Sequence, residues 1–290
     1  MDQRIIDLYD SFTHGLINRR DFMDRLTAVA GSTAAALALL PLLQNDYARA
    51  ATVPVDDARL ATETVSYDAD GVKIGGYLAR LKSKGKRPAI IVIHENRGLN
   101  PHIQDIARRL ALEGFLTLAV DLLSPQGGTP GDEDKARDMF AALKLDETAQ
   151  QTAAAVSFLA RHPESTGNVG TVGFCWGGGM VNRVAVLSPE LKAAVAYYGA
   201  QPPAAQVASI QAPLLLHYAG LDQRINAGIP TYEAALKAAN KRYTIHIYPD
   251  VNHAFNNDTA GDRYNKAAAD LAWGRTIAFF TENLGAPPKA

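Results

Sequence analysis

The chain contains a single cysteine, Cys175, and the residues around it are those of a nucleophile. Gly173 and Gly177 flank it in the order G-x-C-x-G, which is the nucleophile-elbow pattern G-x-S-x-G with cysteine in place of serine. The pattern lies where an apolar run ends and a helical stretch begins. The positive end of that helix would lower the thiol pKa, and the Trp176 N–H would face the oxyanion formed when the thiolate attacks an acyl carbon. The alternative is a buried, inert cysteine, because free cysteine is among the most buried residue types.

An acid and a histidine follow Cys175 in the order that such an elbow requires. Asp222 comes directly after an apolar run that ends in Ala-Gly-Leu, and His253 lies in the next loop but one. We interpret His253 as the general base and acid and Asp222 as the group that orients it. Taken singly, Asp222 reads equally well as a helix or turn cap, and His253 as a turn histidine. The order and the position of the three together favour a catalytic triad.

Apolar runs alternate with helical patterns from residue 62 onward, and this alternation indicates how the three side chains meet. An Asp-Gly step at residues 70–71 predicts a hairpin between the first two strands. We expect an α/β fold with a mostly parallel central sheet, helices on both faces and an antiparallel N-terminal hairpin. The carboxyl ends of parallel strands carry the active sites of such folds. The predicted strands are 62–67, 72–78, 88–94, 115–120, 169–173, 193–198, 213–218 and 243–248, and the predicted helices 101–112, 132–143, 147–161, 177–187, 232–240 and 263–283.

The composition of the 290 residues excludes several other classes of function. Lys and Arg number 29 against 30 Asp and Glu, and a net charge of −1 argues against a nucleic-acid partner. One cysteine excludes an internal disulfide framework and a zinc site with several cysteines. His and carboxylate residues do not cluster at ligand spacing, and the glycines of 173–179 lack the Lys-Ser/Thr pair of a phosphate loop. We therefore expect no metal and no cofactor.

The first fifty residues differ from the rest and leave two interpretations open. Arg19 and Arg20 precede a weakly apolar run at 26–40, and a small-residue site follows at 48–50. Paired arginines, a short Ala-rich core and an A-x-A end are typical of a twin-arginine export signal, which would place the protein in the periplasm. The run is short for a spanning helix, so we expect no stable membrane span. The alternative is an amphipathic helix that is retained and packs on the body or on a second subunit, in a protein that stays in the cytoplasm. We divide the chain into an extension, 1–50, and one catalytic domain, 51–290.

The motifs of the body together resemble the dienelactone hydrolase (carboxymethylenebutenolidase) family of the α/β-hydrolase superfamily. The resemblance covers roughly residues 62–284. It rests on four stretches: His94-Glu-Asn-Arg-Gly98, Gly173-Phe-Cys-Trp-Gly-Gly178, Ala219-Gly-Leu-Asp222 and Asn252-His-Ala-Phe255.

The resemblance implies an α/β-hydrolase fold and a role for each matched residue. Cys175 would be the nucleophile, His253 the base and acid, and Asp222 the group that orients it. Glu95 would interact with the resting thiol, although a carboxylate here could instead cap the helix that begins near Pro101. The backbone N–H groups of Asn96 and Trp176 would form the oxyanion hole.

The sequence departs from the family at the arginines that bind a substrate carboxylate. Neither 121–129 nor 253–257 contains the expected arginine. Arg97 and Arg224 are candidates to replace them, and the alternative for both is a solvated surface charge. Tyr198 and Phe255 are further candidates for the substrate pocket, with a plain core position as the alternative. Dienelactone itself is therefore not the substrate that the sequence favours.

These residues predict a hydrolase that cleaves a small carboxylic ester or lactone through a thioester acyl-enzyme. A thioester route favours substrates with good leaving groups, such as enol lactones and activated esters, over amides. The alternative is a non-catalytic protein of the same fold that binds a ligand or a partner. A redox thiol protein is a third class, but the chain lacks a resolving cysteine. The sequence does not indicate an oligomeric state.

Overall fold

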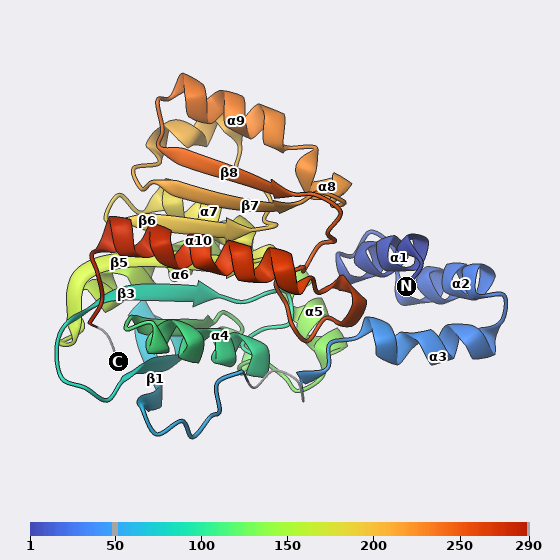
Figure 1. Cartoon of the computed structure of the whole chain (residues 1–290), viewed down its shortest axis with the longest axis horizontal. Helices are drawn as coiled ribbons and strands as arrows, with labels where there is room; N and C mark the ends of the chain where they lie inside the picture. Colours follow the sequence, from blue (N-terminus) through green and yellow to red (C-terminus); the bar gives the residue numbers. More distant parts are fainter. Residues whose placement is uncertain (48–51, 289–290) are drawn as a thin grey trace.

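The computed structural model describes residues 1–47 and 52–288, and its centre is one eight-stranded sheet (Figure 1). The sheet order is β1-β2-β4-β3-β5-β6-β7-β8. Strands β1, β2 and β4 pair antiparallel, and every pair from β4 to β8 is parallel. The predicted α/β-hydrolase fold is confirmed. The strands are β1 Leu60–Ala69, β2 Val72–Leu81, β3 Arg87–Ile93, β4 Leu116–Asp121, β5 Ser165–Phe174, β6 Ala193–Tyr197, β7 Leu214–Ala219 and β8 Tyr243–Tyr248.

The central strands are apolar throughout because helices cover both faces of the sheet. In β3, Ile91 and Ile93 pack into one core and Ile90 and Val92 into the other. The first core is closed by α5 Glu133–Ala141, α6 Leu145–Ala160, α7 Trp176–Leu187 and α9 Ile229–Ala238. The second is closed by α4 Pro101–Leu112 and α10 Lys266–Leu284, which lie together on the near face in Figure 1. A two-sided core of this kind needs continuous apolar strands, as the sequence has.

The predicted hairpin and the predicted last strand are also confirmed. Asp70 and Gly71 have φ of 53° and 85°, as a two-residue turn between β1 and β2 requires, and Ala69 pairs with Val72. Strand β8 is the last strand of the sheet, beside β7. Four short helical segments complete the body: η2 Ser124–Gln126, η3 Ala204–Ser209, α8 Gln223–Asn226 and η4 Gly261–Arg263.

The N-terminal residues form three helices with a small core of their own. They are α1 Gln3–Thr13, α2 Arg19–Ala30 and α3 Thr33–Leu43. Their shared core contains Tyr9, Phe12, Phe22, Leu26 and Leu43. In Figure 1 the three helices lie beyond the arrowheads of β3 and β5, on the side where the parallel strands end. The extension is therefore folded against the edge of the sheet that carries the site.

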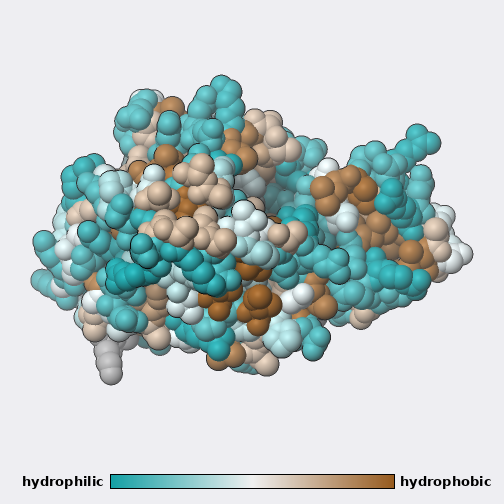
Figure 2. All heavy atoms as spheres, turned by 90° about the horizontal axis from the view of Figure 1, so that it is seen from above, coloured by the Kyte–Doolittle hydropathy of each residue, from teal (hydrophilic) through white to brown (hydrophobic). Residues whose placement is uncertain are grey.

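The apolar run at 26–40 does not form one helix. Gly31, with φ of 82°, ends α2, and the Ser32 side chain caps α3 by accepting from the Ala35 N–H. Among the described helices none alone is long and apolar enough to cross a membrane, and α2 and α3 together pass that test only as a pair bent by 111°. Several apolar side chains of the N-terminal helices and their connections are exposed: Leu16, Val29, Leu37 and Leu42. Figure 2 shows hydrophobic atoms at the surface of this end of the molecule.

The export signal stays a prediction. Its paired arginines, Arg19 and Arg20, lie in the first turn of α2, and its small-residue site at 48–50 lies outside the described residues.

The glycines of the elbow are positions where a side chain has no room. A Cβ on Gly173 would lie 2.3 Å from the Gly177 carbonyl oxygen, whereas a Cβ on Gly274, on the exposed side of α10, would meet nothing within 4 Å. We expect Gly173→Ala to lower the free energy of unfolding by about 2 kcal/mol or more. Gly274→Ala should raise it by about 0.5–1 kcal/mol, because alanine is the better helix former. Urea unfolding of both variants checks this, and equal effects would contradict it.

Candidate active site

Cys175 lies on a sharp turn between β5 and α7. Its φ of 56° and ψ of −117° are unusual for a residue with a side chain, as expected for a strained strand-to-helix elbow. The turn is tight because a Cβ on Gly177 would come within 2.4 Å of two carbonyl oxygens of the β3 end. The thiol is 7% exposed and stands at the carboxyl edge of the sheet. The sequence pattern and the backbone geometry therefore agree on an elbow.

Asp222 and His253 meet beside this elbow. His253 Nδ1 lies 2.5 Å from Asp222 Oδ2, and both residues are buried. The other carboxylate oxygen of Asp222 accepts from the Ile225 N–H and caps α8, so Asp222 is both a cap and the partner of the histidine. His253 Nε2 has no hydrogen-bond partner among the described residues, and a ring nitrogen of His253 lies within 4.8 Å of the sulfur.

A second histidine reaches the thiol from the N-terminal helices. His14 follows the last residue of α1, and its Nε2 lies 3.2 Å from Cys175 Sγ. Its Nδ1 lies 2.8 Å from the Asp10 carbonyl oxygen and 3.2 Å from the Asp10 carboxylate. The sequence analysis missed this residue. His14 has no motif around it, and only the folding of α1 onto the site reveals it.

The charges of the two imidazoles set the ionisation of the thiol. Burial alone would raise the pKa of Cys175, but the positive charges of His253 and His14 outweigh it and lower the pKa to about 6. Burial would lower the pKa of His14, yet the thiolate and Asp10 raise it to about 9. The pKa of His253 is raised in the same way by Cys175 and Asp222. These charges therefore favour the thiolate form of Cys175 at neutral pH, beside two imidazole rings.

Glu95 does not contact the thiol, contrary to the expectation from the family. Its side chain is buried, Oε2 accepts from Asn257 Nδ2 at 3.0 Å, and Oε1 has no partner among the residues described. The capping alternative is also wrong, because Asn100 caps α4 by accepting from the Ile103 N–H. The position beside the sulfur is occupied by His14.

The two amides expected to bind an oxyanion are available. Neither the Asn96 N–H nor the Trp176 N–H donates a hydrogen bond within the described part of the chain. Both residues line the same cavity as Cys175. The Asn96 side chain donates from Nδ2 to the Thr13 carbonyl oxygen at 2.8 Å, which joins this loop to the end of α1.

A cavity of about 470 Å³ opens onto the sulfur and includes two of the four pocket candidates. Tyr198 and Arg224 line it, and the Tyr198 hydroxyl is buried without a partner among the described residues. Arg97 lies elsewhere, buried with its Nε 3.5 Å from Glu133, because the N-terminal helices cover it. Phe255 is fully buried against the Tyr198 and Tyr248 rings and belongs to the core. Arg137 and Arg183 line the cavity and were not predicted.

The fold also brings together three side chains of types that bind metal ions, and their spacing in the sequence did not indicate this. The donor atoms of His14, Cys175 and His253 all lie within 4.8 Å of one another, so these three side chains could hold a soft metal ion. The same arrangement is that of a nucleophile beside two imidazoles. The strained elbow and the unpaired Asn96 and Trp176 amides would serve acyl transfer at the thiol, whereas metal binding would require neither of them.

The sheet, the elbow and the Asp222–His253 pair at the carboxyl edge define an α/β-hydrolase. Residues 74–284 match the sequence profile of the dienelactone hydrolase family. The chain belongs to the dienelactone hydrolase family. Residues 1–31 separately match a family described as YqhI-like.

Relatives of known name are similar over most of their length. A protein of Escherichia coli O157:H7 named "Putative carboxymethylenebutenolidase" is 35% identical over 79% of this chain and 90% of its own. A protein of the same name from Methylorubrum extorquens is 31% identical over 90% of this chain and 93% of its own. A crystal structure named as a putative dienelactone hydrolase from Klebsiella pneumoniae has a TM-score of 0.69, with 30% identity over 77% of this chain and 99% of its own. Ester or lactone hydrolysis is the activity of this family of enzymes, and this chain is such a hydrolase.

The thiol pKa can be measured directly, because every alkylated cysteine in this chain is Cys175. Only the thiolate reacts with iodoacetamide, so the rate should rise with pH through a midpoint of about 6 and then level off. An ordinary cysteine would give a midpoint near 8.5. The measurement is the rate of alkylation by mass spectrometry from pH 4.5 to 9.5, and a midpoint above 8 would contradict the electrostatics described here.

Proposed function

We propose that the enzyme hydrolyses its ester or lactone through a Cys175–His253–Asp222 triad and a thioester intermediate. The observation that carries the proposal is the 2.5 Å contact of Asp222 with His253 beside a buried thiol on a strained elbow. The carboxylate fixes the ring so that Nε2 is left for proton transfer. The elbow presents the sulfur to the cavity, and the helix that follows it favours the thiolate.

The chemistry is acyl transfer in two halves. The Cys175 thiolate attacks the carbonyl carbon, and the Asn96 and Trp176 amides hold the resulting oxyanion. The C–O bond breaks as the His253 imidazolium protonates the leaving oxygen, which gives the alcohol or enol and a thioester. Neutral His253 then takes a proton from water as that water attacks the thioester. Collapse of the second oxyanion releases the carboxylic acid and restores the thiolate and the imidazolium.

The cavity and the nucleophile together indicate the class of substrate. A volume of about 470 Å³ suits a small molecule, and the lining carries Trp176, Phe140 and Met180 beside its polar groups. A thiolate is a good leaving group, so a tetrahedral intermediate returns to reactants unless the other leaving group is also good. Activated esters and enol lactones should therefore react, and amides should not.

The cavity arginines do not form the free carboxylate clamp that dienelactone would need. Each is paired with an acid: Arg137 with Asp134 at 3.1 Å, Arg183 with Asp146 at 2.8 Å and Arg224 with Asp10 at 3.6 Å. The two arginines expected from the family are absent from the sequence. These observations support an ester or lactone substrate other than dienelactone.

Export through the twin-arginine-type segment and residence in the periplasm remain predictions beside this proposal. The competing interpretation, in which the segment is retained, is supported by the packing of the N-terminal helices beside the site.

Removal of the nucleophile or the base should abolish turnover of p-nitrophenyl acetate. We expect Cys175→Ala to be inactive and His253→Ala to lose at least about 10²-fold in kcat, because general acid–base catalysis is lost. His162→Ala is the matched control, since His162 lies at the opposite end of β5 from Cys175, and its rate should stay within twofold of the wild type.

The same measurement separates the alternative function. Full activity in Cys175→Ala would overturn the thioester mechanism. No turnover of any activated ester by the wild type, together with tight binding of one, would indicate a non-catalytic binding protein of this fold.

A further inference from the structure

We propose that His14 is a further catalytic residue, which holds Cys175 as a thiolate, and that the three N-terminal helices are therefore a retained part of the active site. The inference rests on the proposed function, because it assigns a partner to the same nucleophile. It departs from the family's arrangement, in which a glutamate at the position of Glu95 would contact the thiol.

The contact between His14 and the sulfur is direct. His14 Nε2 lies 3.2 Å from Cys175 Sγ, within the range of a hydrogen bond to sulfur. The His14 ring meets the His253 ring edge to face at 4.7 Å, so the two imidazoles contact each other and both lie beside the sulfur. The two rings come from opposite ends of the chain, α1 and the loop after β8.

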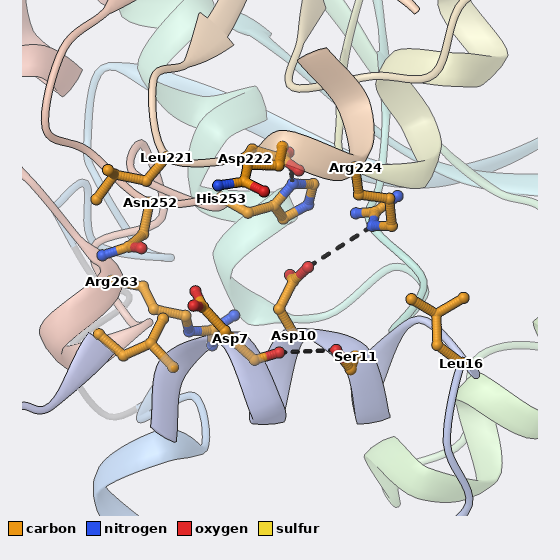
Figure 3. A pocket seen from close by; sticks show the side chains of 12 residues that line it. Asp7, Asp10, Ser11, Leu16, Leu221, Asp222, Arg224, Asn252, His253 and Arg263 are labelled. Atoms are coloured by element: carbon orange, nitrogen blue, oxygen red, sulfur yellow. Dashed lines mark hydrogen bonds and ion pairs between the residues drawn. The ribbon is translucent and has the colours of Figure 1, made fainter. Parts of the chain in front are cut away.

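Asp10 holds the second imidazole in place. Its carbonyl oxygen and carboxylate lie 2.8 and 3.2 Å from His14 Nδ1, which directs the other nitrogen to the sulfur. Figure 3 shows the Asp10 side chain rising from α1 toward His253 and Arg224, and Arg224 Nε lies 3.6 Å from it. His14 also ends α1, where the partial negative charge of the helix terminus favours a cation. A carboxylate and a helix end thus support a positive charge on His14.

Neither of the two carboxyl side chains considered for this site, Glu95 and Asp222, bonds to the thiol, and His14 is the side chain that does. Glu95 bonds to Asn257 instead, and Asp222 bonds to His253. A buried thiolate without a nearby cation would be costly, and His253 alone must give up its proton during the reaction. His14, paired with Asp10, can keep its proton throughout the cycle and remain positive while His253 changes its charge.

The N-terminal helices are tied to the body by contacts specific enough to place His14. Gln3 Nε2 donates to Asn252 Oδ1 at 2.5 Å, one residue from His253, and the Asn96 side chain binds the Thr13 carbonyl oxygen. The Phe12 and Tyr9 rings pack under the guanidinium groups of Arg137 and Arg263, at 4.3 and 5.0 Å. The Asp46 N–H donates to the Thr259 carbonyl oxygen at 2.8 Å.

The comparisons agree that this segment is a unit of its own. Residues 1–31 match the YqhI-like profile. The match with the Methylorubrum protein covers 90% of this chain, which is too much to leave out the whole of residues 1–47. The match of residues 1–31 to a family of its own supports a retained segment over an export signal that is removed.

The proposal assigns His14 a charge role and His253 the proton transfers. In the resting enzyme both imidazoles are protonated and the sulfur is a thiolate. As the C–S bond forms, the negative charge moves from sulfur to the carbonyl oxygen, and His253 gives its proton to the leaving oxygen. His14 keeps its proton and stabilises the sulfur again when the thioester breaks. No oxidant, metal or co-reactant other than water takes part.

The test replaces His14 with asparagine in the full chain and follows iodoacetamide alkylation of Cys175 against pH. We expect His14→Asn to slow alkylation at pH 6.5 by about tenfold or more, because its thiol pKa returns toward the ordinary value. Its kcat for p-nitrophenyl acetate should fall at neutral pH and recover as the pH rises to 9. Asp10→Asn should shift both profiles in the same direction by a smaller amount. His162→Asn should leave both profiles unchanged.

The outcomes separate this inference from the proposed function. Loss of activity in Cys175→Ala together with a wild-type alkylation profile in His14→Asn would overturn only the role of His14. A higher kcat in His14→Asn would also overturn it, since the ring would then obstruct the substrate. The mass of the protein purified from its native host gives a second test. A chain that retains His14 supports the proposal, and an active enzyme that begins after residue 50 contradicts it.

Discussion

The sulfur of Cys175 lies buried beside two imidazole rings that also contact each other, and the surrounding structure must stabilise this group of three side chains. A negative charge at 7% exposure is costly unless cations lie close to it. His253 and His14 provide those cations, and each is stabilised by its own aspartate. In the proposed resting state, the attraction of each imidazolium to its aspartate and to the thiolate offsets the repulsion between the two rings.

Each part of this group depends on a different level of the fold. The parallel strands bring the ends of β5 and β7 to the same edge of the sheet, which places Cys175 and Asp222 at that edge, with His253 bonded to Asp222. The glycines of the elbow let the chain turn sharply enough to raise the sulfur into the cavity. The N-terminal helices close the other side of the site and bring His14 to it. The body of the chain and the extension are therefore in contact at Cys175, the proposed nucleophile.

The order of the strands in the sequence predicted that Cys175, Asp222 and His253 meet. The sequence could not predict His14, because its position depends on how the N-terminal helices pack on the body. Cys175, Asp222 and His253 each follow a predicted strand, so their meeting at one edge can be inferred from the alternation of strands and helices. His14 lies 161 residues from the thiol in a segment whose own pattern fits an export signal. Glu95 was placed by analogy, and the analogy did not include Asn257 as a competing partner. Arg97 was misplaced for a related reason, because nothing in its own motif shows that the N-terminal helices cover it.

The most direct test of the account is to trap the acyl-enzyme. Wild-type protein mixed with p-nitrophenyl acetate and quenched in acid within the first turnover should carry one acetyl group, and digestion should place it on Cys175. Hydroxylamine should remove it rapidly, as it removes a thioester. Turnover with no acyl group on Cys175, or with an acyl group on another residue, would contradict the thioester mechanism.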